Sequence, residues 1–209
     1  MKLLLILFSR WRVIGKDNVP ASGPFIVVAN HLTLADPPLL SASIPRRITF
    51  MAKKEAFRSP ILGPLVRGWR AFPVQRGQLN RDALRRAQQV LDRGMVIGMF
   101  PEGARSVTAK MQPAYPGTSL VALHSGAPVL PVGITGTESL GHPLWVFRRP
   151  RITVNIGEPL KLPAVDGRLN KEELARATDL IMGHIAELLP PSYRGVYANK
   201  ENAVADRKG

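Results

Sequence analysis

The sequence contains no cysteine and has few acidic residues. The lack of cysteine excludes a disulfide framework, a thiolate metal site and a cysteine nucleophile, and it is compatible with a reducing compartment. Only 15 Asp and Glu residues stand against 29 Lys and Arg residues in 209 positions, which gives a formal net charge of +14 at pH 7. A surface this basic attracts nucleic acid, anionic lipid or an acidic protein partner. Charge alone does not choose among them.

The amino terminus lacks an apolar run long enough to cross a bilayer. The run at 3–8 has six residues, whereas a spanning helix needs about 20. Arg10, Trp11 and Arg12 follow it, where a signal peptide would carry a small-residue cleavage site. Two interpretations of residues 1–12 stay open. One is an amphipathic segment in the lipid headgroup region, and the other is a terminal helix packed on the core.

Several familiar site motifs are also missing. The sequence has no GxxxxGK[ST] loop, no GxGxxG after a strand, no GxSxG elbow and no HExxH. His31 and Asp36 are too few for a metal site, and His124, His142 and His184 stand alone. We therefore expect neither a metal nor a bound cofactor.

What is present is an alternation of strand-like and helix-like segments. The predicted strands are the short β-rich stretches 24–30, 47–52, 71–75, 95–100, 128–136 and 151–157. Helices are predicted over 80–94, with Asn80 as N-cap, and over 170–189, where Asn170 and Glu173 have capping-box spacing. This predicts one α/β domain over 13–190, with a largely parallel sheet flanked by helices, and a flexible polar tail over 191–209. Sites in such folds gather at the carboxyl ends of the strands.

His31 directly follows one predicted strand, and Asp36 lies five positions later. A histidine is the side chain most easily used as a base near neutral pH, and a carboxylate on its other ring nitrogen fixes the tautomer. The simpler alternative is a strand-to-helix turn, with Asp36 before Pro37 as N-cap and His31 satisfying loop carbonyls. The two interpretations can coexist if one carboxylate oxygen caps while the other orients the imidazole.

Four ordered blocks resemble those of the glycerolipid acyltransferases, whose best-known members are the 1-acylglycerol-3-phosphate acyltransferases. NHLTLAD (30–36) resembles the NHxSxxD block and FPEGARS (100–106) the FPEGTRS block; 52–77 and 117–136 resemble the family's other two. The resemblance implies a glycerol-phosphate acyltransferase-like fold, with His31 as general base and Asp36 as its orienting partner. Thr33 stands where Ser is usual and keeps the hydroxyl, whereas Ala104 stands where Thr is usual and lacks one.

The resemblance also implies a site for a phosphorylated glycerol acceptor. Arg76, Glu102 and Arg105 would belong to it, and guanidinium groups suit phosphate. We expect Glu102 to accept a hydrogen bond from an acceptor hydroxyl or to hold Arg105, because a carboxylate facing phosphate would repel it. Gly103 would allow close backbone approach, and Asn30 would help to hold the loop.

Basic and aromatic residues interleave in two stretches. Eleven Lys and Arg against two acidic residues lie within 46–86, and 144–151 repeats the combination. Anionic lipid contributes about 1 kcal/mol per surface cation, so such stretches favour reversible membrane docking. The candidates are Arg58, Arg67, Trp69, Arg70, Trp145, Phe147, Arg148 and Arg149.

These observations together predict an acyltransferase peripheral to the cytoplasmic face of the cell membrane. It would move a fatty acyl group from acyl-CoA or acyl carrier protein to the sn-2 hydroxyl of 1-acylglycerol 3-phosphate, giving phosphatidic acid. Glycerol 3-phosphate or another lyso-lipid is the alternative acceptor. A basic nucleic-acid or membrane-binding module is the alternative outside enzymes, but it leaves the four blocks unexplained and shows no nucleic-acid motif.

Overall fold

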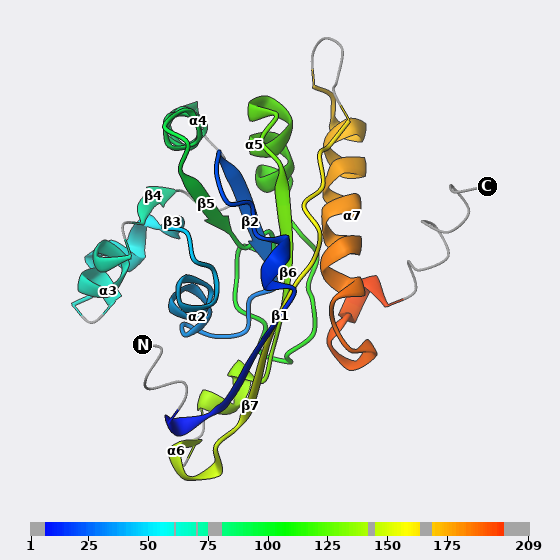
Figure 1. Cartoon of the computed structure of the whole chain (residues 1–209). Coiled ribbons are helices and arrows are strands. Elements are labelled where there is room, and N and C mark those ends of the chain that lie inside the picture. Colours follow the sequence, from blue (N-terminus) through cyan, green and yellow to red (C-terminus); the bar gives the residue numbers. More distant parts are fainter. Residues whose placement is uncertain are drawn as a thin grey trace.

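The structure, a computed structural model, describes residues 7–60, 62–69, 71–74, 81–141, 145–163 and 169–198. Seven strands form one sheet in the order β1-β7-β6-β2-β5-β3-β4. Their bounds are β1 Arg10–Ile14, β2 Phe25–Ala29, β3 Ile48–Lys53, β4 Phe72–Val74, β5 Val96–Met99, β6 Val129–Thr135 and β7 Arg151–Ile156. Figure 1 shows the sheet standing between two layers of helices.

The strand directions indicate which edge of the sheet carries the candidate site. Strands β2, β3, β4, β5 and β6 are parallel to one another, whereas β7 is antiparallel to β6 and β1 is parallel to β7. The carboxyl ends of β2, β5 and β6 therefore meet at one edge, as the rule for open α/β sheets requires of a site. The predicted single α/β domain with a largely parallel sheet is confirmed.

The central strand shows why both faces are covered. In β2, Ile26 and Val28 pack into one core cluster and Phe25, Val27 and Ala29 into the other, because successive side chains point to opposite faces. Helices α4 (Arg81–Asp92), α5 (Gly117–Ser125) and α7 (Lys171–Glu187) cover the first face. Helix α2 (Asp36–Ser43) covers the second. Smaller elements are α3 (Leu62–Gly68), α6 (Trp145–Arg148) and the 3-10 helices η1 Lys16–Asn18, η2 Lys54–Arg58, η3 Thr137–Gly141, η4 Pro191–Tyr193 and η5 Gly195–Tyr197.

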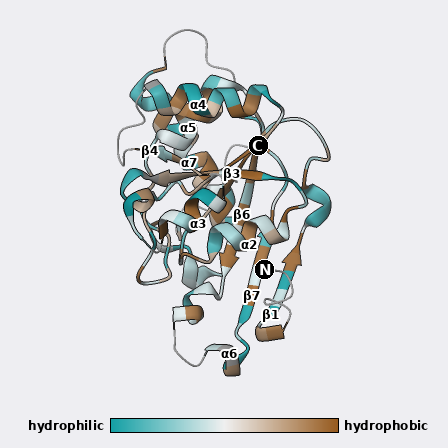
Figure 2. Ribbon diagram, turned by 90° about the vertical axis from the view of Figure 1, so that its left-hand side faces the viewer, coloured by the Kyte–Doolittle hydropathy of each residue, from teal (hydrophilic) through white to brown (hydrophobic). Residues whose placement is uncertain are grey.

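The two predicted long helices are present. Figure 2 shows the hydrophilic and hydrophobic residues of α4, whose Ala83, Ala87 and Leu91 are buried. The predicted N-cap Asn80 lies outside the described residues. At α7 the capping box is complete, because Asn170 and Glu173 each accept a hydrogen bond from the other's backbone N–H.

The first strand corrects the prediction for residues 1–12. Residues 10–12 are not part of a separate terminal segment, since they lie in β1 and pair with β7. Arg10 and Arg12 are exposed while Trp11 packs partly buried against the core, which is the two-residue alternation of a strand. Five residues are too few for this period to stand out beside the apolar run that precedes them.

The carboxyl terminus corrects the other predicted boundary. Residues 191–198 are not a flexible tail, because they form η4 and η5 and Tyr197 is buried. The Tyr193 carbonyl accepts a hydrogen bond from Met111 N at 2.8 Å, and the Tyr197 hydroxyl accepts one from Ala114 N at 3.2 Å. Two tyrosines thus tie this segment to the loop after β5. Residues 199–209 lie outside the described part.

Within the described ranges, no helix has both the length and the apolar character that crossing a membrane requires.

Candidate active site

His31 and Asp36 form a hydrogen-bonded pair at the carboxyl end of β2. His31 Nδ1 lies 2.8 Å from Asp36 Oδ2. Asp36 is fully buried, whereas the His31 side chain keeps 16 % of its surface exposed. The imidazole stacks on the ring of Phe100, with 4.1 Å between the centroids. With Nδ1 held by the carboxylate, Nε2 is the ring nitrogen left for a substrate.

The Asp36 carboxylate organises the loop before it rather than the helix after it. Its Oδ2 also accepts hydrogen bonds from Leu32 N at 2.6 Å and Thr33 N at 2.8 Å. The prediction that Asp36 caps α2 is wrong: Ala35 occupies the N-cap and no side chain caps the helix. The reason is that Pro37 and Pro38, which follow Asp36, have no N–H to donate, and that Leu39 N donates to the Ala35 carbonyl. The chain folds back over the carboxylate instead, which brings His31 to it.

Oδ1 of the same carboxylate is also bonded. It accepts from the Thr33 hydroxyl at 3.3 Å and from the Thr137 hydroxyl at 2.7 Å. Thr33 stands where the block usually has serine, and its hydroxyl makes a hydrogen bond that serine could also make. Every oxygen of this buried carboxylate has a donor, as a buried charge requires.

Asn30 braces the edge of the sheet. Its amide donates to the Ile134 carbonyl at 2.9 Å and accepts from Ile134 N at 2.7 Å, joining the end of β2 to β6. The side chain is 1 % exposed. Both polar ends of the amide are thus occupied by backbone, which suits the expected role in holding the loop and not a direct contact with substrate.

Glu102 joins two loops. Its Oε1 accepts from His31 N at 3.1 Å and its Oε2 from Gln112 N at 2.9 Å. Burial raises the pKa of Glu102 to about 7, against the lowering effect of the Gln112 and His31 N–H bonds. We expected it to hold Arg105 or an acceptor hydroxyl, but its two oxygens hold backbone instead.

The loop after Glu102 lies against His31. Ser106 N donates to the His31 carbonyl at 2.7 Å. Gly103 has φ 63°, which residues with a side chain rarely adopt, and a Cβ there would lie 3.0 Å from the ring of Tyr115. Both facts disfavour a side chain at this position. The Arg105 side chain is exposed and lines the cavity described next. Arg76, the other predicted phosphate ligand, lies outside the described residues.

A cavity of about 450 Å³ opens beside His31. Its walls are mainly apolar and come from β3, η2, α3, β4 and α5, and His31 and Arg105 both line it. The apolar lining side chains include Phe50, Val66 and Leu120. A base, a cation and an apolar recess therefore share one space, a combination that fits a substrate with an acyl chain and an anionic group.

Comparison with known proteins identifies the family. The sequence profile described as Acyltransferase matches residues 10–135, more than half of the chain. The chain belongs to the Acyltransferase family. It is an O-acyltransferase, and the fold implied by the four blocks is the one observed.

Relatives of this acyltransferase are found in several bacteria. It is 31% identical over 189 residues to the 1-acyl-sn-glycerol-3-phosphate acyltransferase of Bacillus subtilis, covering 90% of this chain and 92% of that protein. It is 28% identical to the enzyme of the same name from Streptococcus pneumoniae, covering 88% and 70%. The crystal structure of the 1-acyl-sn-glycerophosphate (LPA) acyltransferase of Thermotoga maritima superposes with a TM-score of 0.67 at 30% identity, covering 90% of this chain and 74% of the other.

The predicted membrane residues of the acyltransferase fall into two places. Arg58 and Arg67 lie on η2 and α3, where Arg67 donates to the Phe57 carbonyl at 3.0 Å. Trp69 is partly buried and lines the cavity, so it is not a free lipid anchor. Arg70 lies outside the described residues. Arg46, counted in the same basic stretch, is structural because it donates to the carbonyls of Pro20, Gly23 and Gly94.

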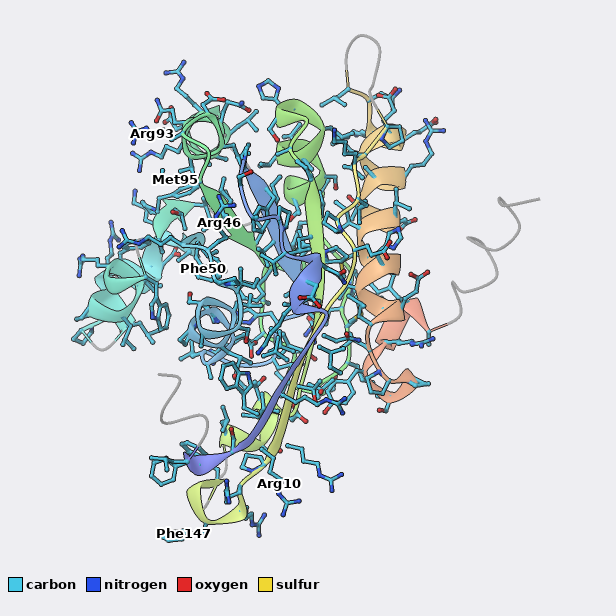
Figure 3. All side chains as sticks on the ribbon, in the orientation of Figure 1. Arg10, Arg46, Phe50, Arg93, Met95 and Phe147 are labelled. Carbon is cyan, nitrogen blue, oxygen red and sulfur yellow. The ribbon has the colours of Figure 1, made fainter. Side chains whose placement is uncertain are left out.

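The second place is a projecting tip, which we define as Arg10, Arg12, α6, Arg149 and Arg151. Phe147 in α6 is 84 % exposed, and all five arginines of the tip (10, 12, 148, 149 and 151) are exposed. Trp145 is partly buried, with its ring 6.4 Å from that of Phe8. Figure 3 shows Arg10 and Phe147 together at the lower end of the molecule, far from Arg93.

Thr137 is the site residue that sequence reasoning missed. It directly follows Gly136 at the end of β6, which is the same carboxyl edge that carries His31 and Glu102. The rule used for those residues would have singled out this edge. No block letter marked the threonine, and only the folded chain brings it to Asp36.

Proposed function

We propose that this enzyme transfers a fatty acyl group from a thioester to the sn-2 hydroxyl of 1-acylglycerol 3-phosphate, which gives phosphatidic acid. The observation that carries the proposal is the His31–Asp36 pair beside an apolar cavity that Arg105 also lines. The names of the Bacillus subtilis and Streptococcus pneumoniae relatives support the choice of acceptor.

In the proposed mechanism His31 acts as a general base. Asp36 holds the proton on Nδ1, and Nε2 takes the proton of the acceptor hydroxyl as its oxygen attacks the thioester carbonyl carbon. The tetrahedral oxyanion then collapses, the carbon–sulfur bond breaks, and the leaving sulfur takes the proton from Nε2. Base catalysis of this kind contributes about 10²–10⁴ in rate. The step uses no cofactor beyond the thioester co-substrate, and no covalent enzyme intermediate.

Different parts of the cavity suit different parts of the substrates. The apolar walls suit an acyl chain, because burying a methylene group contributes about 0.8 kcal/mol. The Arg105 guanidinium suits the phosphate of the acceptor, since its donors match two phosphate oxygens at once. The donor thioester is carried by CoA or by acyl carrier protein, and the basic surface suits the acidic carrier.

The test is an acyl-transfer assay with labelled acyl-CoA and labelled acyl carrier protein against a panel of acceptors. The panel contains 1-acylglycerol 3-phosphate, glycerol 3-phosphate and a lyso-lipid without phosphate. We expect the first to react fastest, and His31→Ala to lose about 10²–10⁴ in kcat with an unchanged melting temperature. His124→Ala, on the exposed end of α5, is the matched control. Wild-type turnover by His31→Ala would contradict the mechanism, and preference for the phosphate-free acceptor would contradict the substrate.

We further propose that the tip docks the enzyme on anionic lipid at the cytoplasmic face of the membrane. Arg10 lies opposite Arg151 on the paired strands β1 and β7, and like charges in register repel unless an anion lies between them. Thr135, the last residue of β6, pairs with Thr153, so Arg151 lies beyond the carboxyl end of β6. The tip thus projects from the edge that carries His31, as Figure 1 shows for α6.

Vesicle binding tests the docking surface. The probes are vesicles of phosphatidylcholine with and without phosphatidylglycerol. At about 1 kcal/mol per cation, Arg148→Ser with Arg149→Ser lowers the affinity for anionic vesicles roughly 10-fold or more. Phe147→Ser lowers it at high salt as well, and Arg93→Ser, at the far end of the molecule, leaves it unchanged. Equal binding by all variants would contradict the proposal. The proposal would also be contradicted if the tip variants bound vesicles normally but lost turnover with the acyl carrier protein donor and not with acyl-CoA. That result would mean that the tip binds the carrier protein.

A further inference from the structure

Thr137 supplies a hydrogen bond to the Asp36 carboxylate from a distant part of the chain. It is fully buried at the start of η3, and its hydroxyl donates to Asp36 Oδ1 at 2.7 Å across 101 positions of sequence. The Thr137 side chain therefore touches Asp36 and lies behind the base, away from the position of the substrate at Nε2.

The carboxylate needs this donor on one particular oxygen. Oδ2 is bonded to His31 Nδ1, Leu32 N and Thr33 N. Among the described residues, Oδ1 has the longer bond from the Thr33 hydroxyl, at 3.3 Å, as its only hydrogen bond besides that from Thr137. The short bond from Thr137 is thus the firm contact on Oδ1, and it fixes the rotation of the carboxylate about its Cβ–Cγ bond. That rotation decides whether Oδ2 faces the imidazole.

The backbone around Thr137 is itself tightly held. Gly136 has φ 87°, and a Cβ there would come within 1.9 Å of the Arg151 carbonyl oxygen, so this turn lies directly against β7. Ile134, three positions before Thr137, is locked to Asn30 by two hydrogen bonds. The hydroxyl therefore reaches Asp36 from a rigid strand end that is fixed to the same level of the sheet as His31.

We propose that Thr137 is a positioning residue for the base. Its hydroxyl holds the Asp36 carboxylate in the orientation that keeps the proton on His31 Nδ1 and leaves Nε2 to accept the proton of the acceptor hydroxyl. This role rests on the proposed function of His31 and Asp36. It extends the pair to a chain of three side chains that come from the segments directly after two adjacent strands, β2 and β6.

The test compares Thr137→Val, Thr137→Ser and Thr178→Val. Valine keeps the shape of threonine and removes the hydroxyl, and serine keeps the hydroxyl. Thr178 is the matched control, because it is a buried threonine of α7 whose hydroxyl donates to Leu174 O at 2.6 Å and is also hydrogen-bonded to the buried Ser119 hydroxyl, away from the base. We expect Thr137→Val to lower kcat about 10-fold or more, the size expected for one hydrogen bond to a charged group, with KM for both substrates unchanged. Thr137→Ser restores most of kcat, and Thr178→Val leaves it unchanged.

A second readout does not depend on turnover. For the wild type we expect proton NMR to show a far-downfield signal from the His31 Nδ1 proton, which His31→Ala removes. The signal shifts or broadens in Thr137→Val and returns in Thr137→Ser. If Thr137→Val lowers the melting temperature more than Thr178→Val does, Thr137→Ala is measured in its place. Alanine also lacks the hydroxyl, and it puts no methyl group in the position of that hydroxyl.

The outcomes separate the two proposals. Normal kcat and a normal His31 signal in a folded variant without the hydroxyl would overturn the role of Thr137. So would equal losses in the serine and valine variants. An active His31→Ala would instead overturn the proposed function on which this inference rests.

Discussion

Asp36 and Arg105 serve the same cavity, yet the fold holds them in opposite ways. The Asp36 carboxylate is buried and bonded on both oxygens by groups from two strand ends. The Arg105 guanidinium is exposed, and it makes no hydrogen bond or ion pair with any residue that the structure describes. A base must be oriented before the reaction, because a misplaced proton acceptor loses rate. A phosphate ligand can be ordered by the phosphate itself.

The largest expected effect follows from breaking the rigid side of this comparison. Asp36→Asn removes the negative charge and replaces one carboxylate oxygen by an NH2 group, which donates hydrogen bonds and cannot accept them. We expect kcat to fall about 10²–10⁴-fold, because His31 loses both its tautomer control and its counter-charge. The measurement is steady-state turnover, with thermal unfolding to report the accompanying loss of stability.

Asp82→Asn, on the exposed side of α4, is the control for the same chemical change. Activity near the wild-type level in a folded Asp36→Asn would show that the carboxylate charge is not needed.

Glu102 provides the second test, because its burial has a stability consequence. A carboxyl whose pKa rises from 4.5 to about 7 on folding holds its proton more tightly in the folded chain. Its stabilising contribution is therefore fully present below pH 4.5 and is lost as the pH rises through about 7. Between those limits we expect the free energy of unfolding of the wild type to fall, relative to Glu102→Gln, by up to about 3 kcal/mol.

Urea denaturation at a series of pH values measures this difference. Glu172→Gln, on an exposed position of α7, should follow the wild type over the whole range. If the wild type and Glu102→Gln give parallel curves, burial does not control the protonation of Glu102.

The smallest effect is expected on the exposed side. Arg105→Ala should raise KM for the phosphorylated acceptor about 10-fold and leave kcat and the melting temperature nearly unchanged, because the guanidinium makes no hydrogen bond or ion pair with the described residues. Arg105→Lys should lie between the two, since lysine binds phosphate as a point charge. Arg93→Ala controls for the loss of one cation. A fall in kcat equal to that of Asp36→Asn would mean that Arg105 acts on the reaction and not on binding.

Local pattern was sufficient for the strands around the site and for the two long helices. The run 25–29 is apolar throughout because β2 is buried on both faces, and the capping box at Asn170 needs only residues of its own turn. The same local view failed at Asp36, which precedes two prolines and looks like an N-cap. Its carboxylate instead accepts hydrogen bonds from Leu32 N and Thr33 N, in the loop before the helix. It failed at β1, because a five-residue alternation at an edge becomes a strand only when β7 pairs with it.

The candidate site divides in the same way. His31 and Arg105 could be selected from the sequence, because each follows a predicted strand and carries a side chain whose chemistry suggests a task. Glu102 was placed at the site, but its partners were not foreseen. They are backbone N–H groups of His31 and Gln112, which carry no sequence signature. Thr137 was missed for a related reason. The role of a hydroxyl depends on the acceptor to which it donates, and only the folded chain brings Thr137 to Asp36.

By itself, the sequence determined the parallel α/β architecture and the identity of a base, a carboxylate and a cation at strand ends, because periodicity and side-chain chemistry are local properties. Only the tertiary structure decided which groups hold the carboxylate, where the apolar cavity lies and which basic residues form the tip. Those are contacts between segments as far apart in the sequence as Arg10 and Arg151, and they exist only after the seven strands have paired in one sheet.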